Sequence, residues 1–253
     1  MSSPVVISAR GLTKDRVSSF LRKRVRVLSS LDLAVTRGET YGLLGPNGAG
    51  KTTTLKILLG LLRPDSGQAT VLDAPAGHPD ALRKIGFLPE NPYFYSHLTA
   101  MEFLDFVGQL FEMSAPERKT RAGELLARVG LSESADRQMV RFSKGMLQRL
   151  GIAQSLINDP EVLFLDEPMS GLDPIGRKDV RLILQELKEQ GKTIFFNSHL
   201  LPDVNEICDR VGVMHQGRLV SEEKVAEISS RGDYRDLEDY FLQQVGSGGH
   251  AEN

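Results

Sequence analysis

Residues 45–60 read GPNGAGKTTTLKILLG and place a glycine-rich loop directly before an apolar helical run. Glycine loses more conformational freedom on folding than any other residue, so three glycines within six positions indicate a loop that needs left-handed backbone or a close approach. Lys51 and Thr52 add a positive charge and a hydroxyl at the end of this loop. This combination suits a polyanionic group that is accompanied by a metal ion.

Composition and charge exclude several classes of protein. The 253 residues are 40% hydrophobic and 25% charged, as in ordinary globular proteins, and the length fits one large domain or a domain with a subdomain. The net charge of -2 gives no general attraction for nucleic acid, so no nucleic-acid partner is expected. The longest apolar run, 57–62, is far shorter than the roughly 18 residues of a membrane span. Cys208 is the single cysteine, so we expect a buried thiol in a cytoplasmic protein that meets a membrane only through a partner.

Apolar runs of strand length alternate with helical patterns in the later part of the chain. This alternation predicts an α/β fold whose parallel strands are joined by helices. Strands are expected at 5–9, 31–35, 40–44, 85–89, 162–166, 193–197 and 211–215, and a helix at 51–62. The stretch 91–158 has no strand pattern but has capping boxes at 99–102 and 114–117, so we predict an inserted α-helical subdomain there.

The glycine loop satisfies the pattern Gly-x-x-x-x-Gly-Lys-Thr and stands between an expected strand and an expected helix. Its backbone N–H groups and the helix N-terminus can surround the β- and γ-phosphates of a nucleotide. Lys51 would add a point charge, and the Thr52 hydroxyl would bind Mg²⁺. A glycine-rich turn without a ligand is the alternative. The candidate nucleotide-binding residues of this loop are Gly45, Pro46, Asn47, Gly48, Ala49, Gly50, Lys51, Thr52 and Thr53.

A second motif, VLFLDEP at 162–168, complements the loop. Its apolar residues predict a buried strand that ends at Asp166, and open α/β sheets gather ligands at the carboxyl ends of their strands. Asp166 can hold Mg²⁺ through water, and Glu167 is placed to orient or deprotonate an attacking water. A surface Asp-Glu pair is the alternative. Together the two motifs predict a P-loop NTPase that hydrolyses a nucleoside triphosphate.

Residues 142–174 resemble the signature-to-D-loop block of the ABC ATPases, the nucleotide-binding subunits of ABC transporters; they read FSKGMLQRLGIAQSLINDPEVLFLDEPMSGLDP. The family commonly has Leu-Ser-Gly-Gly-Gln where this chain has FSKGM. Ser143 and Gly145 match this signature, whereas Lys144 and Met146 depart from it.

Two further motifs extend the resemblance over residues 5–220. SGLD at 170–173 is similar to the D-loop, and Asn-Ser-His at 197–199 is similar to the switch region. The resemblance implies a RecA-like core with a mixed or parallel sheet, an N-terminal antiparallel β subdomain and the inserted helical subdomain. This ATPase domain would span 1–235, and 236–253 would form a C-terminal helix and a disordered tail.

The resemblance also implies a mechanism. Two such subunits would face each other head to tail and bind ATP and Mg²⁺ between them. Ser143 and the Gly145 amide would bind the γ-phosphate held by the opposite subunit. Within one subunit, Lys51, Glu167 and His199 would act on the nucleotide, with His199 contacting the γ-phosphate.

Two candidate residues carry a second interpretation. Asp173 would line the shared interface of the two subunits, but Asp173-Pro174 also fits a helix N-cap followed by proline at the first helical position. Glu90 stands where the family usually has glutamine. Its carboxylate would meet Mg²⁺ or a metal-bound water, or it is a surface glutamate.

The adenine-binding residue differs from the family pattern. A tyrosine commonly follows Leu-Thr-Lys, whereas this chain has Arg16 and then a basic segment, 16–27. Phe20 would stack on the base, Arg16 would stack through its guanidinium, or Val27 would supply an apolar wall. The basic segment is interpreted as a solvated loop, with contact to anionic headgroups as the alternative.

Partners follow from the same resemblance. Tyr93, Phe94 and Tyr95 would receive a short helix of a membrane permease, or they belong to the core of the helical subdomain. The amphipathic stretch 234–245 resembles the tail of ATPase subunits of ABC-2-type exporters. We therefore expect an ATPase subunit at the cytoplasmic face of a membrane, paired with a second nucleotide-binding subunit and driving a separate permease.

Two other functions are alternatives to this one. A soluble ABC ATPase that acts on ribosomes or DNA is the main alternative, although such proteins usually carry two fused domains or long coiled coils. This chain has one phosphate loop and a short spacing between Lys51 and Asp166. A small-molecule kinase would leave Glu167, the signature and His199 unexplained together.

Overall fold

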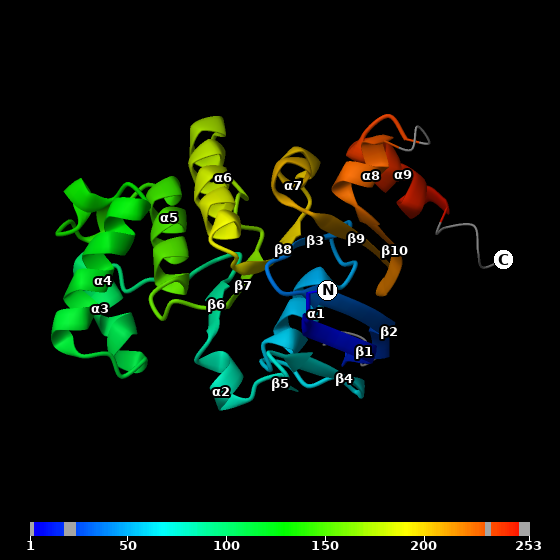
Figure 1. Ribbon diagram of the computed structural model, residues 1–253, viewed down its shortest axis with the longest axis horizontal. Coiled ribbons are helices and arrows are strands. Elements are labelled where there is room, and N and C mark those ends of the chain that lie inside the picture. Colours follow the sequence, from blue (N-terminus) through cyan, green and yellow to red (C-terminus); the bar gives the residue numbers. More distant parts are fainter. Residues whose placement is uncertain (1–2, 18–23, 231–233, 248–253) are drawn as a thin grey trace. The chain divides into compact units, whose positions relative to one another are not determined.

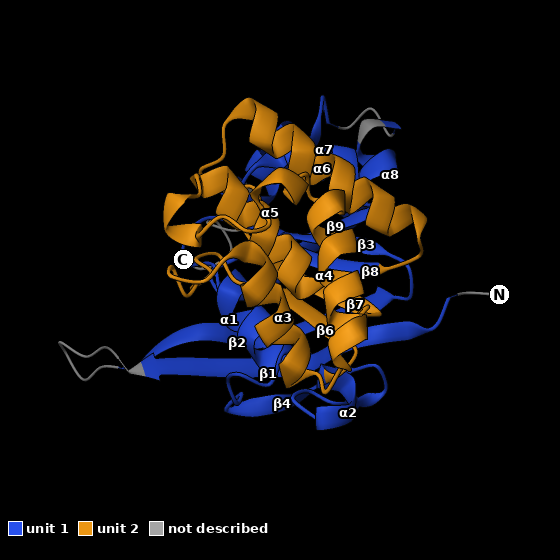
Figure 2. Cartoon of the chain, turned by 90° about the vertical axis from the view of Figure 1, so that its left-hand side faces the viewer, with its two compact units in different colours: residues 1–82, 193–253 blue, residues 83–192 orange. Residues whose placement is uncertain are grey.

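The computed structural model describes residues 3–17, 24–230 and 234–247. The chain divides into two compact units, which Figure 2 shows in different colours. Unit 1 combines 1–82 with 193–253, and unit 2 is 83–192.

Unit 1 contains an antiparallel sheet with the strand order β2-β1-β4-β5 (Figure 1). Its strands are β1 (Val5–Val17), β2 (Arg24–Thr36), β4 (Ser66–Val71) and β5 (Ala74–Pro75). Alternate residues of β2 are buried, among them Leu31, Leu33 and Val35, which is the pattern of a strand with one face on a core. The predicted N-terminal antiparallel β subdomain is therefore confirmed, whereas β4 and β5 were not predicted.

The basic segment 16–27 was predicted to be a solvated loop, and this is wrong at both of its ends. Residues 16–17 continue β1, and residues 24–27 begin β2. Acidic residues offset part of the positive charge beside these strand ends: Asp15 pairs with Arg26, and Lys14 pairs with Asp65 at 3.0 Å.

Unit 1 also contains parallel strands, with β3 between β8 and β9. The parallel strands are β3 (Thr40–Leu44), β8 (Thr193–Ser198) and β9 (Arg210–His215). Strand β10 (Arg218–Lys224) pairs antiparallel with β9. Every residue of β3 and β8 is buried, as their unbroken apolar runs predict. Leu44 pairs with Ser198 and with Val213, so these parallel strands end at one common edge.

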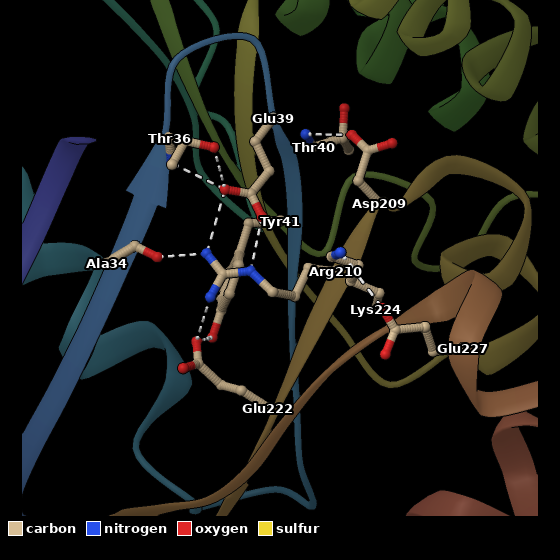
Figure 3. Close-up of polar contacts among 10 residues, drawn as sticks. All are labelled: Ala34, Thr36, Glu39, Thr40, Tyr41, Asp209, Arg210, Glu222, Lys224 and Glu227. Carbon is tan, nitrogen blue, oxygen red and sulfur yellow. Dashed lines mark hydrogen bonds and ion pairs between the residues drawn. The ribbon is translucent and has the colours of Figure 1, made fainter. Parts of the chain in front are cut away.

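An ionic cluster closes the opposite end of these strands (Figure 3). The Arg210 guanidinium donates to both carboxylate oxygens of Glu39, at 2.7 and 3.1 Å, and contacts Glu222 at 3.3 Å. The buried Tyr41 hydroxyl also donates to Glu222, at 2.6 Å. Burial alone would raise the pKa of Glu39, but hydrogen bonds from Arg210 and Thr36 and the Arg210 charge hold this pKa below its ordinary value. The cluster thus ties β2, β3, β9 and β10 together.

The helices of unit 1 are α1 (Lys51–Leu58), α2 (Pro79–Leu82), α7 (Leu201–Ile207), α8 (Val225–Ser230) and α9 (Leu237–Ser247). Helix α1 ends four residues before the predicted end at residue 62. Gly60 has φ +72, and a Cβ there would lie 2.2 Å from the Gly77 Cα, so the chain turns where two backbones meet. Cys208 is buried, as expected.

Unit 2 contains the parallel pair β6 (Ile85–Leu88) and β7 (Val162–Asp166), with the helices α3 (Ala100–Leu110), α4 (Ala115–Arg128), α5 (Lys144–Ser155) and α6 (Pro174–Glu189). Short 3₁₀ turns occur at Ser132–Ser134 and Met139–Arg141. Both predicted capping boxes are present, at the starts of α3 and α4. Three helices fall within 91–158, whose boundaries as a subdomain remain a prediction. Over the described residues of both units, no helix is long and apolar enough to cross a membrane.

Candidate nucleotide-binding site

The glycine loop connects β3 to α1 and takes the backbone shape that its glycines predict. Gly48 and Gly50 have φ of +83 and +108, in the left-handed region that favours glycine. Residues 46–48 form an exposed tip, whereas Gly45 and Gly50 are buried. A Cβ on Gly50 would lie 2.7 Å from Leu28 Cδ2, so close approach also requires glycine there.

The Lys51 side chain folds back over the loop. Its ammonium donates to the carbonyl oxygens of Gly45, at 2.6 Å, and Pro46, at 3.3 Å, and the side chain is largely buried. Gly50 is the N-cap of α1 and offers no side chain to cap the first helical N–H groups. A cation and the N-terminus of α1 therefore lie together at the loop, where the helix dipole also favours an anion.

These features fit the phosphates of a nucleotide. Built on Gly48, a Cβ would meet no atom within 4 Å, so the loop tip faces open space. Each unit by itself contains one oxygen ligand of the kind that Mg²⁺ prefers: in unit 1 Thr52 lies half-buried in the first turn of α1, and in unit 2 Asp166 is buried at the end of β7. Among the described residues no group of three or more His, Cys, Asp or Glu side chains gathers as a metal site. Magnesium binding by Thr52 and by Asp166 stays a prediction.

His199 follows β8, which is parallel to β3. Because Leu44 pairs with Ser198, His199 comes after its strand at the same sheet edge as the glycine loop. The His199 side chain is exposed. Its contact with a phosphate stays a prediction.

In unit 2, Asp166 ends the fully buried strand β7 and Glu167 follows it, and both are buried. Glu167 has φ +52, a left-handed conformation that costs a residue with a side chain about 1–2 kcal/mol. Such strain clusters at functional sites. The segment after it is held by the buried Gln148, whose amide donates to the Pro168 carbonyl at 2.7 Å.

The candidate signature residues lie at the start of α5. Ser143 is the N-cap, exposed, and its hydroxyl accepts from the Met146 N–H at 3.2 Å. Gly145 is open, since a Cβ there would have no neighbour closer than 3.9 Å. Ser143 and Gly145 are therefore accessible in unit 2 itself.

Asp173 caps α6: its carboxylate accepts from the Gly176 N–H at 2.9 Å, with Pro174 at the first helical position. The N-cap interpretation is confirmed. Asp173 is exposed, and its place in a subunit interface stays a prediction.

The remaining candidates are Glu90 for the metal and Phe20, Val27 and Arg16 for adenine. Glu90 is exposed after β6. Phe20 lies outside the described residues. Val27 is half-buried in β2, and its carbonyl oxygen lies 3.0 Å from where a Gly50 Cβ would be, so it borders the glycine loop. Val27 is thus the adenine candidate that the structure places beside the loop, while Arg16 is exposed in β1.

The three consecutive aromatics separate into two kinds. Phe94 packs edge-to-face on Phe103, with ring centroids 5.2 Å apart, and its ring also faces Gly151. Tyr93 is 85% exposed and Tyr95 44% exposed, and Tyr95 stacks edge-on against the partly exposed Phe106. The half-buried Phe94 therefore contributes to packing within unit 2, whereas the two tyrosines lie on its surface, and contact with a permease stays a prediction.

Comparison with known proteins identifies the family. The sequence model described as ABC transporter matches residues 28–170. The chain belongs to this family.

Its relatives carry transporter names. It is 54% identical over 215 residues to an uncharacterized ABC transporter ATP-binding protein of Synechocystis sp., covering 84% of this chain and 61% of that relative's length. It is 44% identical over 225 residues to a fluoroquinolones export ATP-binding protein of Mycobacterium tuberculosis, covering 88% of this chain and 72% of the relative.

The fold also matches a solved ABC cassette. The ATP-binding cassette MJ0796, in a dimeric post-hydrolysis state bound to ADP and Pi, superposes with a TM-score of 0.78 at 27% identity. The match covers 86% of this chain and 98% of MJ0796. The predicted ABC ATPase fold is therefore confirmed.

Proposed function

We propose that this chain is the ATP-binding and ATP-hydrolysing subunit of an ABC exporter, which pairs with a second nucleotide-binding subunit and drives a separate membrane permease. The observation that carries the proposal is the glycine loop of a chain of the ABC transporter family, where the Lys51 ammonium folds over the loop at the N-terminus of α1.

In the proposed reaction, the loop amides and Lys51 hold the β- and γ-phosphates of ATP. Thr52 and Asp166 would hold Mg²⁺, whose charge offsets that of the phosphates. Glu167 orients a water molecule and accepts its proton as the water attacks the γ-phosphate. His199 contacts the γ-phosphate, and Glu90 is assigned to the metal or its water.

A second nucleotide-binding subunit completes the reaction. We assign Ser143 and the Gly145 amide to the γ-phosphate held by the other subunit, and Asp173 to the interface. The accessibility of Ser143 and Gly145 supports this, as does the dimeric state of the MJ0796 cassette with ADP and Pi.

The exposed tyrosines are the proposed contact for the permease. Tyr93, Tyr95 and Phe106 form an aromatic surface of the kind that anchors a partner helix. Membrane attachment through a permease places the chain at the cytoplasmic face. Export as the direction is supported by the fluoroquinolones export relative.

One purification tests the whole proposal. The tagged chain is purified from detergent-solubilised membranes of its source, and its Mg²⁺-dependent ATP hydrolysis is measured with and without the integral protein that accompanies it. We expect one integral membrane protein to co-purify and to change the ATPase rate. Co-purification with ribosomes instead of an integral protein would contradict the proposal. So would the absence of ATP hydrolysis both with and without the integral protein.

A further inference from the structure

The glycine loop is backed by residues 214–217, which we call the backing segment. It comprises the end of β9 and the turn into β10. The Met214 carbonyl oxygen lies 2.5 Å from where a Gly45 Cβ would be, and the Gly217 N–H donates to the Ala49 carbonyl at 3.0 Å. The segment therefore contacts the loop at its beginning and near its end.

The Met214 side chain adds a third contact. Its sulfur accepts from the Thr54 hydroxyl at 3.8 Å, and its methyl group lies 3.1 Å from where a Gly50 Cβ would be. The loop is rich in glycine, so its conformation is costly to fix by local preference alone. Contacts from β9 and the following turn help to fix the conformation of the loop.

Gly217 connects the loop to β2 as well. Its carbonyl accepts from the Ser29 N–H at 2.9 Å. A Cβ on Gly217 would lie only 2.4 Å from the Val27 carbonyl oxygen. The turn therefore links the glycine loop to the strand that carries Val27.

The backbone of this turn explains why glycine is needed at its second position. His215 pairs with Arg218, so Gln216 and Gly217 form a two-residue hairpin turn, with φ of +47 and +79. Positive φ at both residues is the geometry that matches the twist of the flanking strands. An alanine at 217 would both strain this backbone and push the turn away from β2.

We propose that Gly217 is a positioning residue for nucleotide binding: without touching the nucleotide, it holds the glycine loop in its phosphate-binding shape through the bond to Ala49. The inference rests on the proposed ATP binding. Displacing the turn removes that bond and loosens the loop, so affinity for the phosphates falls.

The test compares Gly217→Ala with Gly191→Ala. Gly191 has nearly the same φ, +77, but a Cβ there would meet no atom within 4 Å. MgATP binding is measured by isothermal titration, hydrolysis over a range of ATP concentrations, and folding by urea unfolding. We expect Gly217→Ala to raise the dissociation constant and the KM about tenfold, the scale of one well-placed hydrogen bond, with kcat within about twofold of wild type. Gly191→Ala should bind ATP as wild type does.

Equal ATP affinity of folded Gly217→Ala and Gly191→Ala would overturn the inference. Wild-type protein that binds no ATP would overturn the proposed function instead, so the two failures are distinct. If Gly217→Ala does not fold, the ATP affinities of Met214→Ala and Met214→Leu test the backing segment instead. Met214→Ala should weaken ATP binding by at least about threefold and Met214→Leu should restore it; equal affinities of these two variants would also overturn the inference.

Discussion

The side chain of Lys144 lies across the backbone of Gly171: a Cβ on Gly171 would be 2.0 Å from the Lys144 ammonium nitrogen and 2.9 Å from its Cε. Gly171 has φ +68, so its backbone favours glycine, whereas the exposed end of the lysine could move aside for a larger residue. Lys144 is one of the two positions where the chain departs from the family's signature. Within unit 2, this departure brings the start of α5 against the segment that precedes α6.

Replacing Gly171 tests this contact. Gly171→Ala should lower the free energy of unfolding by about 1 kcal/mol, the left-handed strain alone, because the exposed lysine can move aside. In a Lys144→Ala background the same change should therefore have the same cost. Urea unfolding of the four proteins in this cycle measures the difference. A smaller cost without the lysine would show that its displacement contributes.

Glu167→Gln tests the proposed base. The variant should bind ATP and accumulate as an ATP-bound dimer, while hydrolysis falls about 10²–10⁴-fold, the usual contribution of a positioned base. Phosphate release and light scattering with ATP measure the two effects. Glu161→Gln, beside the same strand, removes an ion pair with Lys84 and should leave hydrolysis near wild type. Near-normal turnover by Glu167→Gln would exclude Glu167 as the base.

Lys51→Ala tests phosphate binding by the loop. It removes the ammonium that lies over the Gly45 and Pro46 carbonyls, so MgATP affinity should fall at least about tenfold, the scale of a charge-assisted hydrogen bond. Lys56→Ala, an exposed position on the same helix, is the control and should not change affinity. Wild-type ATP affinity of Lys51→Ala in direct titration would contradict the assignment.

The ionic cluster around Arg210 should make stability depend on pH. The folded-state pKa of Glu39 is lowered, so its contribution is complete above the ordinary value of about 4.3 and is lost as the pH falls through the lowered value. Glu39→Gln should therefore cost about 2 kcal/mol of unfolding free energy at pH 7, with a smaller difference from wild type in acid.

Urea unfolding between pH 7 and pH 3 measures this effect. Glu112→Gln is the matched control, since the Arg83–Glu112 pair is exposed and should contribute less than about 0.5 kcal/mol. A Glu39→Gln difference that stays constant over the whole pH range would exclude Glu39 as its source.

The aromatic surface gives a prediction with opposite outcomes for neighbouring residues. Tyr93→Ala with Tyr95→Ala should reduce retention of the permease and leave stability and ATP binding unchanged, because both rings are exposed. Phe94→Ala should instead lower the unfolding free energy by about 2 kcal/mol, because its ring packs on Phe103. Co-purification and thermal unfolding separate the two. Full permease retention by the double tyrosine variant would remove this surface from the proposal.

Sequence patterns predicted the parts of the fold that are locally encoded. The unbroken apolar runs of β3, β7 and β8 and the glycine pattern of the loop are visible within a few residues. Strand β10 was missed because its residues alternate between half-buried and exposed with charged side chains, and β4 because it is mostly exposed and has few apolar residues.

Other features depend on contacts between residues distant in the sequence. No local pattern shows that Gly217 would bond to Ala49, although a Gln-Gly pair after an apolar strand is a signal for a hairpin turn. Likewise, the sequence does not show which of the aromatic residues Tyr93 and Phe94 packs inside the protein. Only the packing on Phe103 separates their environments.

The left-handed backbone of Glu167 makes heat resistance a poor guide to activity at one position. A glycine there would relieve a strain of about 1–2 kcal/mol, but it would also free the unfolded chain and remove the contacts of a buried side chain. Because we assign the carboxylate to the chemistry, that variant would be inactive whatever its heat resistance. A screen for thermal tolerance alone would thus not recognise the loss of function at residue 167.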